Sequence, residues 1–211
     1  MERFAARETV LPGVFELSAL PRGDARGFFE RVFCSEELRE VGFDRPIAQI
    51  NLSHNEHIGT LRGMHFQKPP FTEIKMVRCT LGRIYDVALD LRRDSPTFLQ
   101  HVAVELDAQR HNALVLPKGV AHGFQSLSAK SELLYFLSSP YAPLYDAGIN
   151  ALDRALAIAW PLAVNDELRS PRDVQLPTAA DFLAQADWEW DEDRVGGRGG
   201  VIYILILLFT D

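Results

Sequence analysis

The sequence predicts an all-β domain with the architecture of a sandwich or a barrel. Two stretches alternate apolar with polar residues, which is typical of strands that bury one face: Tyr85, Val87, Leu89 and Leu91 in the first, and Val102, Val104 and Leu106 in the second. Gly, Pro, Asn or Ser residues separate further short strand-like runs at residues 47–52, 74–80, 113–116 and 132–137. Many short strands with this spacing favour a sandwich or a barrel.

Two short helices are predicted at the periphery of this domain. The first begins at Ser35, which we interpret as its N-cap, continues through an acidic first turn and ends at Gly42. The second begins at Thr178, with Asp181 three residues later as in a capping box. Neither helix carries an obvious chemical motif.

The 211 residues are enough for one well-buried domain, and we assign residues 1–186 to it. From Asp187 the composition changes to an aromatic and acidic stretch, then GGRGG and VIYILILLF. The final apolar run is far shorter than the roughly 20 residues of a membrane-spanning helix. Residues 187–211 are therefore interpreted as an atypical C-terminal tail, to which we assign no function.

The net charge and the cysteine content limit the cellular compartments and the classes of partner that can be expected. The net charge of −7 argues against a nucleic-acid surface, so an anionic ligand must meet a local basic cluster. Cys34 and Cys79 have no partnering pattern and suit two reduced thiols. The N-terminal residues lack an export signal, so a cytoplasmic location is expected, with no membrane partner.

Two polar segments could carry chemistry. Residues 62–67 (RGMHFQ) bring Arg62 and His65 together, and Lys75 follows in a predicted strand. Residues 117–124 (PKGVAHGF) place His122 after a Pro/Gly turn, which is how a rigid scaffold presents a side chain to a cavity. The four other histidines are expected to be structural: His54, His57, His101 and His111.

The order of several segments resembles that of the dTDP-4-dehydrorhamnose 3,5-epimerases and related sugar 3-epimerases of the cupin superfamily. The resemblance spans roughly residues 12 to 182 and rests on segments 24–30 (DARGFFE), 49–51 (QIN), 59–67 (GTLRGMHFQ), 75–78 (KMVR), 86–92, 95–97 (SPT), 117–124 and 135–143. It implies a double-stranded β-helix, or jelly roll, usually dimeric. It also implies a dTDP-sugar substrate in the barrel mouth and no metal or organic cofactor.

The resemblance also implies four catalytic roles. His65 would be the general base, Asp173 its orienting carboxylate and Tyr135 the acid on the opposite face. Inversion next to a ketone requires proton removal from one face and proton return to the other, and a cation beside the tyrosine would ease its proton loss. Lys75 would stabilise the negative charge that develops on the C4 oxygen of the enolate.

Substrate contacts are carried over in the same way. Arg26, Arg62 and Arg172 would bind the nucleotide diphosphate, because guanidinium groups match its oxygens. Phe28 would stack on the base or line the cavity. Further family contact positions match Glu30, Gln49, Asn51, His122, Tyr141 and Asp146. The family commonly has glutamate at the position of Asp146 and lysine at that of Arg172, so contacts to the nucleotide could differ in reach.

Three alternatives stay open at this stage. Inversion could be limited to C3, because relatives use the same scaffold for one inversion or for two. A metal-binding cupin could use His65, His122 and Glu73, although Gln67 stands where a second histidine of the first cupin motif is expected. A non-catalytic protein could bind a nucleotide sugar without converting it.

Overall fold

The computed structural model describes residues 1–185, and the predicted tail at 187–211 lies outside this range. Thirteen strands and a few short helices form the described chain. The strands are β1 (Phe4–Glu8), β2 (Phe15–Ala19), β3 (Arg22–Asp24), β4 (Gly27–Phe29), β5 (Gln49–Asn55), β6 (Leu61–Gln67), β7 (Lys75–Leu81), β8 (Arg83–Asp90), β9 (His101–Asp107), β10 (Asn112–Leu116), β11 (Val120–Ser126), β12 (Ser131–Leu137) and β13 (Asp146–Gly148). The helices are α1 (Ser35–Leu38), α2 (Pro171–Val174) and α3 (Ala179–Gln185), with 3-10 turns at Arg39–Val41, Arg154–Leu156 and Asp166–Leu168.

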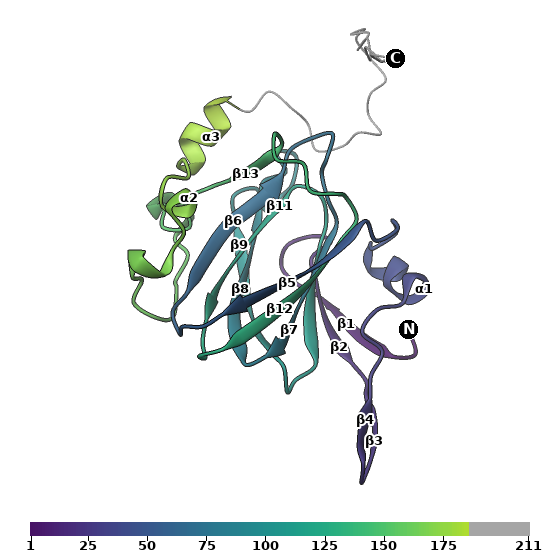
Figure 1. Cartoon of the computed structure of the whole chain (residues 1–211). Helices are drawn as coiled ribbons and strands as arrows, with labels where there is room; N and C mark the ends of the chain where they lie inside the picture. Colours follow the sequence, from purple (N-terminus) through teal and green to yellow (C-terminus); the bar gives the residue numbers. More distant parts are fainter. Residues whose placement is uncertain (186–211) are drawn as a thin grey trace, which may run out of the picture.

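Two antiparallel sheets face each other and form the predicted cupin jelly roll (Figure 1). The six-stranded sheet has the order β1-β2-β10-β7-β12-β5, and the five-stranded sheet has the order β13-β6-β11-β8-β9. Between them lies an apolar core that takes Val77 and Leu114 from the first sheet and Ile84 and Phe124 from the second. The all-β prediction is confirmed, because alternation along each strand sends every second side chain into this core.

The helices cover outer faces and leave the interior to strands. Phe182 of α3 packs beside Val87 and Leu89 on the outer face of the five-stranded sheet. Leu38 of α1 and Phe43 pack beside Met76 on the outer face of the six-stranded sheet. No helix within residues 1–185 combines the length and hydropathy needed to cross a bilayer.

The helix boundaries agree with the sequence at one helix and differ at the other. Thr178 caps α3 as predicted: its Oγ1 accepts from the Asp181 backbone N–H at 3.1 Å and lies 2.6 Å from Asp181 Oδ2. Ser35 is already the first residue of α1, and the cap position belongs to Cys34, which makes no side-chain cap hydrogen bond. The N-cap prediction for Ser35 is therefore wrong by one residue. The α-helix itself ends at Leu38, and Gly42, with a left-handed backbone (φ 86°), ends the 3-10 turn that continues it.

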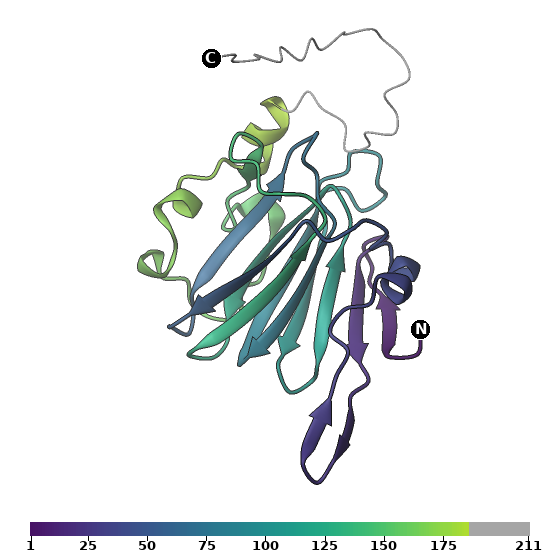
Figure 2. The ribbon, with the colours of Figure 1, turned by 45° about the vertical axis from the view of Figure 1, so that its right-hand side comes forward.

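The hairpin of β3 and β4 extends away from both sheets (Figures 1 and 2). Its strands pair only with each other, and Phe28 and Phe29 are 61% and 74% exposed. Two large apolar side chains therefore lie on a projection that the described chain leaves largely uncovered.

Candidate active site

A cavity of about 250 Å³ lies between the two sheets. Its walls combine polar side chains with a few apolar ones from five strands: Asn51, Leu52, Ser53, Arg62, His65, Lys75, His122, Phe124, Tyr135 and Leu137. Six of the fourteen site residues predicted from the sequence therefore share one cavity: Asn51, Arg62, His65, Lys75, His122 and Tyr135.

His65 and Asp173 form the predicted pair. His65 Nε2 lies 2.6 Å from Asp173 Oδ1, and the side chains are 29% and 3% exposed. Burial works to raise the pKa of Asp173, but the hydrogen bonds from His65 and Gly63 together with the charge of Arg172 outweigh it, so the pKa lies below the usual value. An ionised carboxylate only accepts hydrogen bonds, so Nε2 carries the proton and Nδ1 is left as the basic nitrogen.

The chain around Asp173 is built to present its carboxylate to β6. Ser170 caps α2 by accepting from the Asp173 backbone N–H at 3.0 Å, and Pro171 occupies the first turn, where no N–H is needed. The buried Arg169 donates to the Asp173 carbonyl at 3.0 Å. The second carboxylate oxygen accepts from the Gly63 N–H at 3.2 Å. The orientation of Asp173 is therefore fixed from both sides.

Glycines let β6 and β11 approach closely beside the two cavity histidines. A Cβ on Gly63 would lie 2.5 Å from the Gly123 Cα, and Gly63 has a φ of 116°. A Cβ on Gly123 would lie 2.8 Å from the Arg62 carbonyl oxygen. His65 and His122 are register partners in this strand pair, so the glycines bring the two rings to one end of the barrel.

Lys75 is buried and paired. Its Nζ lies 3.1 Å from Glu73 Oε1, and both side chains are 10% exposed. Glu73 Oε2 also accepts from Gln67 Nε2 at 3.1 Å, and Gln67 Nε2 donates to the Phe71 and Pro140 carbonyls. This network fixes the ammonium group at the cavity wall while leaving it further N–H donors for a ligand.

Tyr135 lies on β12, in the sheet opposite His65. Burial and the negative charge of Asp86 raise the pKa of Tyr135 well above its usual value, although Arg62 and a hydrogen bond with Ser53 act in the opposite direction. Arg62 is the neighbouring cation and works to ease proton loss from Tyr135, but burial and Asp86 outweigh its effect on the pKa. The phenol stays protonated and can donate.

Asp86 was not assigned from the sequence. It is fully buried, its Oδ1 lies 2.5 Å from His122 Nε2, and Oδ2 has no hydrogen-bond partner in the described chain. The ring of His122 meets that of Tyr135 edge to face at 5.9 Å. The sequence pattern gave no indication of this position, because Asp86 alternates with the apolar residues Tyr85 and Val87 and was therefore expected on the polar face of its strand.

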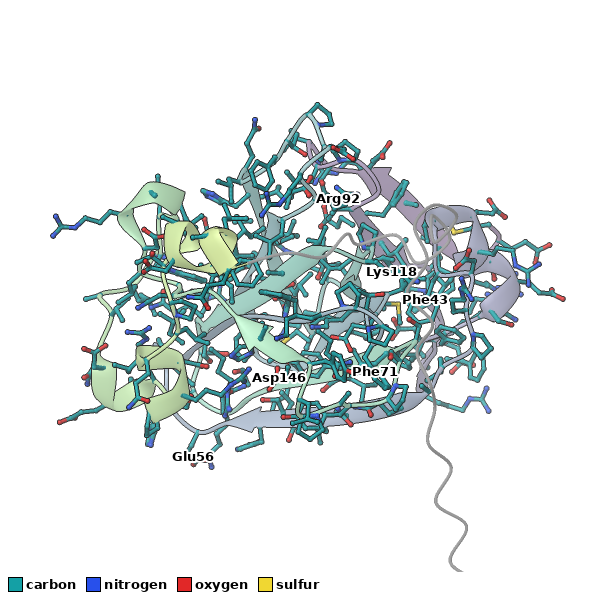
Figure 3. All side chains as sticks on the ribbon, turned by 90° about the horizontal axis from the view of Figure 1, so that it is seen from above. Phe43, Glu56, Phe71, Arg92, Lys118 and Asp146 are labelled. Atoms are coloured by element: carbon teal, nitrogen blue, oxygen red, sulfur yellow. The ribbon has the colours of Figure 1, made fainter. Side chains whose placement is uncertain are left out.

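A second polar group lies beside the dyad. Tyr141 Oη donates to Asp146 Oδ2 at 3.0 Å, and Arg172 NH2 lies 2.8 Å from Asp146 Oδ1. Gln49 Oε1 accepts from the Tyr141 N–H at 2.8 Å. Asp146 lies near the middle of the view from above, whereas Glu56 lies at the margin (Figure 3). Because Arg172 precedes Asp173, this group of four predicted residues adjoins the His65 side of the cavity.

The structure does not bring Arg26, Phe28 and Glu30 to the cavity of their own chain. Arg26 is on the projecting hairpin and pairs with Asp24 at 2.7 Å. Glu30 pairs with Arg78 at 2.5 Å and with His111 at 3.0 Å. Arg78 lies three residues after Lys75 in β7, so the two point to opposite faces of the sheet. Phe28 contacts the His111 ring on that outer side at 4.8 Å.

The ligands required by the metal-binding alternative are not gathered. Within residues 1–185 no three His, Cys, Asp or Glu side chains are placed to share a metal ion. His65 and His122 each direct Nε2 to an aspartate, and Glu73 is bound by Lys75 and Gln67. Both cysteines are free, as predicted, and burial raises the pKa of the Cys79 thiol to about 11.

The two packed sheets define a protein of the cupin fold. The cavity inside its barrel holds a lysine, a histidine that pairs with an aspartate, and a tyrosine on the opposite sheet. Residues 8–181 match the family model of dTDP-4-dehydrorhamnose 3,5-epimerase. The chain therefore belongs to this family and is a carbohydrate epimerase.

Individual relatives agree with this assignment. A dTDP-4-dehydrorhamnose 3,5-epimerase of Sinorhizobium fredii is 42% identical over 66% of this chain and 71% of its own length. A dTDP-4-dehydro-6-deoxyglucose 3-epimerase of Streptomyces bikiniensis is 37% identical over 81% of this chain and 86% of its own. The crystal structure of the 3,5-epimerase of Bacillus anthracis with TDP and pyrophosphate bound has a TM-score of 0.79 and 36% identity, covering 83% of this chain and 99% of that one.

Proposed function

We propose that the cavity inverts C3, and also C5, of a dTDP-4-keto-6-deoxyhexose in deoxysugar biosynthesis. The observation that carries this proposal is the placement of His65 and Tyr135 on opposite sheets around one cavity. Inversion beside a ketone needs a proton acceptor on one face of the sugar ring and a proton donor on the other. The bound TDP in the relative from Bacillus anthracis supports the nucleotide assignment.

Each of four residues would have one role in the reaction. His65 Nδ1 accepts the proton from carbon, and the C–H electron pair moves into the enolate, with negative charge on the C4 oxygen. Asp173 holds Nε2 and stabilises the imidazolium that forms. Lys75 stabilises the enolate oxygen. Tyr135 returns a proton to the opposite face. His65 then releases its extra proton to solvent, and the Tyr135 phenolate takes one up.

C3-only inversion is the second candidate. The relatives include both a 3,5-epimerase and a 3-epimerase at similar identity, so likeness does not discriminate between them. The cavity residues named above serve either outcome, because the C4 carbonyl acidifies the hydrogens on both neighbouring carbons.

One labelling experiment tests activity and position together. The purified protein is incubated with dTDP-4-keto-6-deoxyglucose in heavy water, and deuterium is located by NMR. We expect label at C3 and at C5 with inverted configuration at both. Label at C3 alone supports the 3-epimerase, whereas no label at either carbon refutes the enzyme proposal for this substrate and favours a non-catalytic binding protein.

The predicted dimer gives a role to the hairpin. Arg26 and Phe28 lie away from their own cavity and are exposed, so a second copy of the chain is needed if they are to contact nucleotide. Sedimentation of the wild-type protein and of an Arg26→Ala/Phe28→Ala variant tests this. A monomeric wild-type protein with full activity would contradict the dimer proposal.

A further inference from the structure

Most cations predicted for the site are already paired with a carboxylate. Lys75 pairs with Glu73 at 3.1 Å, Arg172 with Asp146 at 2.8 Å and Arg26 with Asp24 at 2.7 Å. Arg62 differs, because no carboxylate of residues 1–185 lies in ion-pair contact with its guanidinium group, although it lines the cavity. Its charge reaches the cavity interior, since it works to lower the pKa of Tyr135 against the raising effects of burial and Asp86.

A neutral side chain holds Arg62 in place. Asn55, at the end of β5, accepts from Arg62 Nε at 2.9 Å through Oδ1 and is only 2% exposed. Its Nδ2 faces Ser131 on the neighbouring strand β12, with distances of 3.3 Å to the carbonyl oxygen and 3.5 Å to Oγ. The contacts with the sheet therefore help to fix the direction of the Asn55 amide.

The choice of an amide over a carboxylate has an electrostatic consequence. An aspartate at position 55 would hold Nε in the same geometry but would cancel the charge of the guanidinium group. An amide oxygen fixes one of the five N–H donors and leaves the other four, and the full positive charge, for an incoming anion. A fixed fork of donors also loses less side-chain entropy when it binds.

We propose that Asn55 is a positioning residue that keeps Arg62 oriented and uncompensated for the diphosphate of the substrate. This inference rests on the proposed nucleotide-sugar function. It concerns Asn55 specifically, whose effect on the ligand passes through the guanidinium group of Arg62.

The test measures the Kd of dTDP by calorimetry for the full-length protein. Asn55→Asp, which is nearly identical in shape, is expected to weaken binding about ten- to a hundredfold. Its carboxylate would compensate the charge that Arg62 offers to the diphosphate, and one hydrogen bond to a charged group contributes about that factor. Asn55→Ala, which removes the hold but not the charge, is expected to weaken binding less. In steady-state assays Asn55→Asp should raise KM more than it lowers kcat.

A double-mutant cycle separates this role from a purely structural one. In an Arg62→Ala background, Asn55→Asp should change Kd by less than about twofold, because the group through which it acts is gone. Asn112→Asp is the matched control: Asn112 is also 2% exposed and also donates to a backbone carbonyl, but it lies outside the cavity. Thermal unfolding of every variant reports any loss of fold.

The outcomes are distinct. Equal weakening by Asn55→Asp in both backgrounds, or by Asn112→Asp, would assign the effect to the fold and overturn the proposal. Wild-type affinity in Asn55→Asp would overturn it as well. A wild-type protein that does not bind dTDP would refute the proposed nucleotide-sugar function itself, and the inference with it.

Discussion

The Nε2 atom of His122 lies 2.5 Å from Oδ1 of Asp86, and neither side chain is more than 5% exposed. Removing one partner of a buried pair leaves the other without compensation, so Asp86→Ala should lower the free energy of unfolding by about 3 kcal/mol. Urea denaturation measures this loss. Asp24→Ala, at the exposed pair with Arg26, is the control and should leave stability unchanged. Equal stability of Asp86→Ala and wild type would show that the buried pair makes no net contribution.

His65→Ala should reduce deuterium incorporation at both C3 and C5 by about a hundredfold or more, because the base that opens each step is gone. NMR of the sugar after incubation in heavy water measures both positions. His57→Ala, an exposed histidine outside the cavity, should incorporate label at the wild-type rate. Normal incorporation at either carbon in His65→Ala would assign that proton transfer to another group.

Tyr135→Phe should still exchange the C3 proton but should not yield inverted product. The base side of the cavity is intact in this variant, whereas the donor on the opposite sheet is missing. Chiral analysis of the labelled sugar separates exchange with retention from inversion. Tyr85→Phe, on the outer side of the five-stranded sheet beside Trp160, is the matched control. Inversion by Tyr135→Phe at the wild-type rate would contradict the assignment.

Asp173→Asn should destabilise the protein at pH 7 and less so at pH 3. The pKa of Asp173 is lower in the folded protein than the ordinary 3.8, so its ionised form stabilises the fold above that value, and this contribution is lost as the pH falls through the folded pKa. Urea denaturation at the two pH values measures the gap between wild type and variant, with exposed Asp44→Asn as control. A gap of equal size at pH 3 would mean that ionisation of Asp173 is not its source.

The strands that the sequence predicts are those with regular alternation, such as β8 and β9, and their boundaries agree within a few residues. Strands β6 and β11 were seen only as polar segments, because Gly63, His65 and His122 interrupt the apolar pattern. These interruptions are candidate site positions, so the residues that broke the apolar pattern of the strands are also those that predicted the cavity.

Asp86 and Asn55 show which features of the candidate site could not be predicted from the sequence. Each is a single polar residue in a strand, and its partner lies on another strand: His122 is distant along the chain from Asp86, and Arg62 follows Asn55 after the turn between β5 and β6. The packing of one strand against another brings such pairs together, and the alternation within one strand does not say which residue of another strand it will meet. The outward placement of Glu30 could not be predicted for the same reason, because it depends on Arg78 lying on the far face of β7.

The proposed base and the proposed acid, His65 and Tyr135, belong to different sheets, and packed side chains such as Val77, Leu133 and Phe124 set the spacing between those sheets. Facing sheets lie about 10 Å apart, and this separation responds to the volume of the residues that fill it. The apolar filling thus acts as a spacer for the two proton-transfer groups. On the proposed mechanism, we expect that enlarging or shrinking a core residue that never meets the sugar changes the ratio of inverted to returned stereochemistry.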